Sequence, residues 1–179
     1  MADTRRTVAA LLVLWADNAT GDVSPQDGRD WMVSTSPAYG SLYWATPAET
    51  TVAAVDTPVK ASGTTASVAA SSDVTVATTN RLTYTGAPTL SAKVWANITM
   101  TAAANNKLVS LHIAKNGSVI ASAEMRRTVG TGADYGNMGT HTIVSLAQND
   151  YVEIWVENET DAVNITVQTG VFSLETIFI

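Results

Sequence analysis

Hydrophobic and polar residues alternate through the stretch Met138–Asn158. In its second half every other residue is aliphatic, namely Val152, Ile154 and Val156. A period of two places these side chains on one face of a β-strand. The polar segment Gln148–Asp150 suits a tight turn, because Asn and Asp side chains bond to their own backbone. The pattern predicts a β-hairpin with one buried face, which requires a sheet and a second layer above it.

The same alternation occurs earlier in the chain. Thr89–Thr101 reads as a long strand that turns Val94, Ala96, Ile98 and Met100 to one face and Lys93, Trp95, Asn97 and Thr99 to the other. Leu108–Ala114 and Val119–Met125 flank Asn116-Gly117. This pair is preferred in two-residue type I′ turns, so the segment predicts a hairpin. We expect Val109, Leu111 and Ile113 to point inward and His112 to point outward.

The remaining strands are shorter. We expect them at Leu42–Ala45, Thr57–Ala61, Arg81–Thr85, Gly139–Leu146, Asn164–Val167 and Val171–Ile179. Ser62–Thr79 is rich in Ser, Thr and Ala and is expected to be a long surface loop with one strand at most, and Thr128–Asn137 a second loop. About eight to ten strands with short turns predict an all-β fold of two antiparallel sheets, or a barrel.

The N-terminal region has a helical period instead. Val8, Leu11, Leu12 and Trp15 share one helical face, with Asp3 or Thr4 before it as a cap. Ser24-Pro25-Gln-Asp27 has the residues of a capping box and predicts a second helix to about Ser34, which carries Trp31 and Met32. Two readings stay open, namely helices packed on the sheet of their own domain, or a docking arm that binds another protein. The sequence favours the arm, with residues 1–36 as the helical arm and residues 37–179 as the β-domain.

Composition narrows the function classes. The net charge of −6 argues against nonspecific binding to nucleic acid, which needs a basic surface. There is no cysteine, and the apolar run Val8–Trp15 is far shorter than the roughly 20 residues that span a membrane. We therefore expect neither nucleic-acid binding nor membrane insertion.

Residue patterns typical of catalysis are missing from the sequence. His112 and His141 have no carboxylate at a metal-binding spacing, and there is no nucleophile elbow or phosphate-binding loop. We expect no enzyme activity, no metal and no cofactor. Glu153 and Glu157 fall on one strand face and are expected to be solvated. The basic pairs Arg5-Arg6 and Arg126-Arg127 are also expected to be solvated, with docking against an acidic partner surface as the alternative.

The β-region resembles the tumour necrosis factor and complement-type jelly roll. In that family a turn before Asp leads into a strand of the form Asp-x-Val-x-Leu/Ile-x-Val, which here is Asp150–Val156. The hairpin Ile113–Ile120 is similar to the family's central hairpin, and a final strand also matches. The resemblance implies an antiparallel jelly-roll β-sandwich that forms a homotrimer. The first, third, sixth and last strands would face the threefold axis and bury Trp44, Trp95, Phe172 and Phe178 between subunits. On this chain they are the strands near Leu42–Ala45, Thr89–Thr101, Gly139–Leu146 and Val171–Ile179. The alternative for Trp95, Phe172 and Phe178 is ordinary packing in the core of one chain. The chain lacks the family's cysteines and its collagen or transmembrane stalk, which sets aside a cytokine or complement role.

The segment Ala16–Asp30 is similar to one that precedes such jelly rolls in bacteriophage structural proteins. This implies a virion protein made in the bacterial host cytoplasm and placed on the capsid surface. The expected function is a trimeric capsid decoration (cement) protein that binds the major capsid protein, or another virion protein, and stabilises the shell. The docking residues would be Val8, Leu11, Leu12, Trp15, Trp31 and Met32. The alternative is a receptor-binding knob of a tail or head fibre that contacts a host surface glycan or receptor through Ser62–Thr79 and Thr128–Asn137. The chain has no long shaft, which favours decoration.

Overall fold

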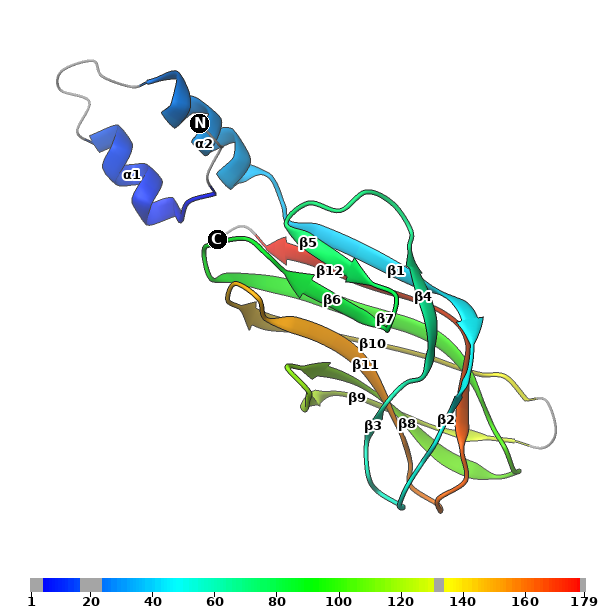
Figure 1. Cartoon of the computed structure of the whole chain (residues 1–179). Helices are drawn as coiled ribbons and strands as arrows, with labels where there is room; N and C mark the ends of the chain where they lie inside the picture. The colour runs from blue at the N-terminus through cyan, green and yellow to red at the C-terminus, as the bar shows by residue number, and fades with distance from the viewer. Residues whose placement is uncertain (1–4, 17–23, 131–133, 178–179) are drawn as a thin grey trace.

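The computed structural model describes residues 5–16, 24–130 and 134–177 and shows two antiparallel sheets packed face to face (Figure 1). The first sheet has the order β10 (Gly136–Leu146), β7 (Leu90–Ala102), β12 (Ile165–Ile177), β1 (Tyr39–Pro47), β4 (Gly63–Ser67), and β2 (Glu49–Thr50) also pairs with β12. The second sheet has the order β5 (Val74–Ala77), β6 (Arg81–Tyr84), β11 (Tyr151–Asn158), β8 (Lys107–Lys115), β9 (Ser118–Val129), and β3 (Val59–Lys60) pairs with β11. The predicted all-β jelly-roll sandwich is confirmed.

The core lies between the sheets and is built from the predicted alternation. Val94 and Ile98 enter it from β7, while Leu111 and Ile154 enter it from β8 and β11. All four side chains are buried. Each such aliphatic side chain stabilises the fold by roughly 1.5–3 kcal/mol through burial alone. The four strands expected to share a sheet, namely β1, β7, β10 and β12, do so.

The hairpin predicted over residues 138–158 is wrong. Its turn forms, with Asn149 at a φ of 70° and the Asp150 amide donating to the Ala147 carbonyl at 3.0 Å. However, β10 pairs with β7 in the first sheet, whereas β11 pairs with β8, β6 and β3 in the second. The connection therefore crosses from one sheet to the other. A period of two shows that one face of a strand is buried, but it does not select the neighbour that pairs with its backbone.

The loop predicted over Ser62–Thr79 is also wrong, because it holds two strands, β4 and β5. Thr65 of β4 is fully buried although it is polar. Its amide donates to the Thr78 carbonyl and its hydroxyl to the Ala77 carbonyl, each at 2.9 Å. A buried hydroxyl is tolerated when it is hydrogen-bonded, so hydropathy alone misses this position. At the other end of the chain, the two short strands predicted after Asn164 form one long strand, β12, with an irregularity after Val167.

The two predicted helices form and are α1 (Val8–Ala16) and α2 (Pro25–Thr35). The capping box is confirmed, because the Asp27 amide donates to the Ser24 hydroxyl and the Ser24 amide to the Asp27 carboxylate. The Thr7 hydroxyl accepts from the Ala10 amide at 3.1 Å and so caps α1, while the expected caps Asp3 and Thr4 lie outside the described residues. Figure 1 shows the helices side by side beyond one end of the sandwich, covering neither sheet. Within the described ranges, neither helix is long and apolar enough to span a bilayer.

Asp150 ties together two turns at one end of the second sheet. Asn116 and Gly117 both have positive φ, which confirms the predicted turn between β8 and β9. The Asn116 side chain donates to the Asp150 carboxylate at 2.7 Å, and the Lys115 ammonium lies 2.8 Å from it. Hydrogen bonds from Lys115 and Asn116, and a further one from the Ala147 amide, lower the pKa of Asp150 from 3.8 to about 2.

This pKa predicts a pH-dependent contribution to stability. Because the folded-state pKa is below the unfolded value, the charge stabilises the fold above pH ~4 and this contribution is lost as the pH falls through about 2. We expect Asp150→Asn to unfold at lower urea concentration than the native chain at pH 7, and the difference to close between pH ~4 and ~2. Urea titrations followed by circular dichroism measure it. Asp56→Asn, at an exposed aspartate that also has positive φ, is the matched control. A difference that persists unchanged at pH ~2 would contradict the assignment.

Candidate functional site

The outward face of the first sheet gathers aromatic and aliphatic side chains. Because β1, β12, β7 and β10 bury alternate residues in the core, the residues between them point away from it. Their register aligns them in rows across the sheet, and one row joins Tyr43, Val171, Asn97 and Gly139. We call this surface the outer face, and its large apolar or aromatic members are Tyr39, Tyr43, Trp95, Ile143 and Val171.

The outer face is little charged and well exposed. Tyr43 is 42% exposed, Val171 41% and Ile143 64%. Trp95 is half-buried, with the Lys93 ammonium 5.7 Å from its ring centroid. A shallow depression of about 660 Å³ runs between Tyr43 and Val171 and is lined partly by Asn97 and Thr99. Contiguous exposed side chains of this kind mark a surface for a protein partner.

Two of the four predicted interface residues do not reach the outer face. Trp44 is 4% exposed and Phe172 is fully buried, and both belong to the core between the sheets. The interface prediction is therefore wrong for these two residues, because strand alternation turns their neighbours Tyr43 and Val171 outward instead. Trp95 lies on the outer face as expected. Phe178 lies outside the described residues.

The second candidate surface is the helical arm, which we define as residues 5–16 and 24–36. It contains α1 and α2. Val8, Leu12 and Met32 are between 55% and 65% exposed, and Trp31 is 45% exposed. Of the other predicted docking residues, Leu11 is buried but is not part of the sandwich core, and the side chain of Trp15 lies outside the described residues. The helices enclose a groove of about 350 Å³ lined by Val8, Leu11, Leu12, Trp31 and Thr35. The side chains that line the groove are almost entirely apolar, yet in a single chain the groove is open to solvent.

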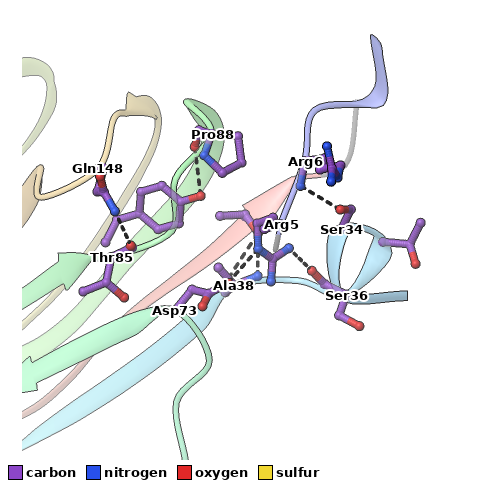
Figure 2. A network of polar contacts seen from close by, with 12 residues as sticks. Arg5, Arg6, Ser34, Ser36, Ala38, Asp73, Thr85, Pro88 and Gln148 are labelled. Atoms are coloured by element: carbon purple, nitrogen blue, oxygen red, sulfur yellow. Dashed lines mark hydrogen bonds and ion pairs between the residues drawn. The ribbon is translucent and has the colours of Figure 1, made fainter. Parts of the chain in front are cut away.

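A polar network joins the arm to the sandwich (Figure 2). The Arg5 guanidinium contacts the Asp73 carboxylate and the Ser36 carbonyl, with 2.6 Å between Arg5 Nε and Asp73 Oδ2. Arg6 pairs with the buried Asp30 of α2 at 2.8 Å. The expectation that Arg5 and Arg6 are solvated is wrong for Arg5, whose side chain is 4% exposed. Its main partner is 68 residues away in sequence, so no local pattern could have revealed the contact.

The outward side of the second sheet is charged, in contrast to the outer face of the first sheet. Its charged side chains form ion pairs with each other within one chain. Glu153 was expected to be solvated, but its side chain is 2% exposed and lies 2.5 Å from Lys60 and 2.8 Å from Arg81. Burial acts to raise the pKa of Glu153, but hydrogen bonds from Lys60 and Arg81 outweigh it and lower the pKa. Glu157 is likewise buried and contacts His112 at 2.9 Å. His112 points outward as predicted, yet it too is buried. Within the described ranges no three acidic or histidine side chains could hold a metal ion.

Comparison with known proteins identifies the fold. No protein-family model matches the chain, and no curated protein matches it in sequence. Among solved structures, murine APRIL, a member of the tumour necrosis factor family, superposes with a TM-score of 0.53 at 8% identity. That match covers 78% of this chain and 99% of APRIL. Vertex protein P5 of the phage PRD1 superposes with a TM-score of 0.50 at 10% identity and covers 79% of this chain and 97% of P5. The chain thus shares the jelly-roll fold of both proteins.

The burial of Phe172 gives a direct test of which face it occupies. We expect Phe172→Ala to lower the free energy of unfolding by about 3–5 kcal/mol, because it removes a ring from a closed core. Urea unfolding at a fixed low protein concentration measures this loss. Val68→Ala, at an exposed valine of the β4–β5 connection, should change stability by less than about 0.5 kcal/mol. A small effect of Phe172→Ala on unfolding, together with loss of self-association, would return this residue to a subunit interface.

Proposed function

We propose that the chain is a phage structural protein that forms a homotrimer and decorates the capsid. In this proposal the arm binds the major capsid protein, or another virion protein, and thereby stabilises the shell. The observation that carries the proposal is the apolar surface of the arm. Val8, Leu12, Trp31 and Met32 stay exposed on helices that could have packed against the nearby sheets. A monomer gains nothing from such a surface, whereas a docking protein needs it.

The energetics of the arm suit a repeated shell. Burying its exposed side chains contributes about 25 cal/mol for each Å² of apolar surface removed from water. One arm offers a few large side chains, so each contact is weak by itself. Three arms on one trimer raise the effective concentration of the second and third contacts, and the combined affinity rises by about 10²-fold or more. A capsid, whose surface repeats the same site, permits such simultaneous binding.

The outer face of the first sheet supports the trimer. Tyrosine and tryptophan are enriched in protein interfaces, and charged residues are depleted at interface cores. Tyr39, Tyr43 and Trp95 with Val171 meet that description. The outer face is also the one that the tumour necrosis factor resemblance turns toward the threefold axis. The fold shared with a phage vertex protein supports a place in a virion.

A charge on the outer face tests the trimer. In Val171→Arg, three arginines would be brought together around the threefold axis, where their repulsion and desolvation oppose assembly. We expect the native protein to scatter light as a particle of about three times the chain mass of 18.8 kDa, and the variant to scatter as a monomer. Val119→Arg, at a comparably exposed valine of β9 in the second sheet, should remain a trimer. Native protein that stays monomeric at all accessible concentrations would refute the interface.

A charge on the arm tests docking. We expect Leu12→Glu to weaken binding to purified capsids by at least about tenfold, because each arm would place an unpaired carboxylate in an apolar contact. Co-sedimentation of labelled protein with capsids measures it, and Val119→Glu on the second sheet is the control for added negative charge.

The same variant separates the two candidate roles. Leu12→Glu should keep the trimer mass, because the arm lies apart from the outer face. If capsid binding survives the substitution and the isolated protein instead binds host cells, the decoration role is wrong and the receptor-binding knob is favoured.

A further inference from the structure

Arg5 is buried to a degree that is unusual for a charged side chain. Its side chain is 4% exposed, although it lies just before the first turn of α1. Burying a guanidinium is unfavourable unless its N–H groups are paired. The pairing is present, because Nε donates to Asp73 at 2.6 Å and Nη1 donates to the Ser36 carbonyl. The planar guanidinium fixes the angle between these two bonds, which an ammonium group does not do.

The two contacts of Arg5 join segments that are distant in sequence. Asp73 belongs to the sandwich, where its carbonyl accepts from the Thr85 amide at 2.9 Å and its φ is 50°. The residue before it, Ser72, pairs with Tyr39 at the start of β1. Ser36 lies directly after α2 and begins the short link to β1. One guanidinium therefore holds the segment before α1, the end of α2 and the sandwich together, as Figure 2 shows.

The neighbouring residue holds the two helices to each other. The Arg6 side chain pairs with Asp30 Oδ2 at 2.8 Å, and the Arg6 amide donates to the Ser34 hydroxyl at 2.7 Å. Asp30 is 1% exposed and also accepts from Gln26 at 2.7 Å. The segment before α1 is thus bonded to the second half of α2 and to the residue that follows it. The arm is one unit, and Arg5 bonds it to the sandwich in addition to the short covalent link between α2 and β1.

Apolar packing between the arm and the sandwich is too sparse to set their angle. None of the helix residues belongs to the hydrophobic core of the sandwich. A cavity of about 230 Å³ separates the two parts, lined by Arg6, Thr7 and Val8 on one side and by Leu90, Ser145 and Ile177 among the residues on the other. The angle between the arm and the sandwich must then be set by directional polar contacts.

We propose that Arg5 is a positioning residue that fixes the direction of the arm relative to the sandwich, so that the apolar surface of the arm is held ready for its partner. The last part of this inference rests on the proposed docking function. An arm fixed before binding loses less conformational freedom on binding than a hinged one. In a trimer, the same clamp repeated three times sets three arms at one angle, which simultaneous attachment to a shell requires.

The direction of the arm can be measured without any partner. The chain has no cysteine, so Ala9→Cys on α1 and Ala121→Cys on β9, both exposed, accept two spin labels at known places. Labelled chains diluted into unlabelled ones give the distance within one chain by double electron–electron resonance. We expect one narrow distance peak for the chain with the native contacts of Arg5, and a broad distribution of distances for Arg5→Ala and for Asp73→Asn. Arg5→Lys keeps the positive charge but lacks the planar guanidinium that donates two hydrogen bonds at a fixed angle. The width of its distance distribution should therefore be intermediate.

Controls separate positioning from folding. Lys107→Ala removes an ion pair of similar length, Lys107–Asp161, far from the arm and should leave the peak narrow. Asp73 is 35% exposed in its side chain, so Asp73→Asn should fold, and circular dichroism melting checks each variant. A narrow, unshifted peak in folded Arg5→Ala or Asp73→Asn would overturn the inference.

Capsid binding distinguishes this inference from the function on which it rests. If both hold, Arg5→Ala binds capsids about tenfold more weakly while keeping the native trimer mass and melting temperature, and Arg5→Lys recovers part of the loss. If the native protein itself does not bind capsids but the distance peak broadens in the variants, the clamp stands and the docking function fails. If the peak broadens and capsid affinity is unchanged, the positioning role in docking is wrong.

Discussion

Each strand of the first sheet sends alternate side chains to opposite faces, and only one of those faces can be buried against the second sheet. This constraint decides which residues are left for other molecules. Phe172 enters the core and Val171 does not, although they are adjacent, and the same division separates Trp44 from Tyr43. The outer face is what remains after the core has been filled. The fold of one chain therefore does not need aromatic and aliphatic side chains on the outer face. The proposed self-association would explain them, because it would bury them between copies of the chain.

The arm is held by a different kind of interaction. Its helices share no core with the sandwich, and Arg5 connects them to it through a half-buried ion pair with Asp73 and a hydrogen bond to Ser36. Such a contact fixes an angle but adds little net stability, because desolvation of the charges offsets their attraction. The combination leaves the apolar groove between α1 and α2 open while keeping it in a set direction. The proposed function assigns separate tasks to the two surfaces, with the outer face for copies of the chain and the arm for a shell.

Local signals in the sequence predicted what depends on near neighbours. The turn at Asn116-Gly117 and the capping box from Ser24 to Asp27 formed as expected, because both are complete within four residues. The strand period also predicted the buried face of β7. It could not show that β10 and β11 lie in different sheets, because pairing is decided by residues far along the chain. Thr65 and Arg5 were missed for the same reason, since distant partners make the burial of their polar groups tolerable. Of the residues predicted for a subunit interface, Trp95 lies on the outer face, whereas Trp44 on β1 and Phe172 on β12 point into the core.

We propose that the chain sits on a capsid as a trimer attached by its arms. A cryo-electron microscopy reconstruction of purified capsids incubated with an excess of the protein tests it most directly. The account predicts added density with threefold symmetry, in which the first sheets face the local axis and the helical arms contact the shell. Density in which single sandwiches contact the shell without a threefold neighbour, or trimers whose arms point away from it, would contradict the account.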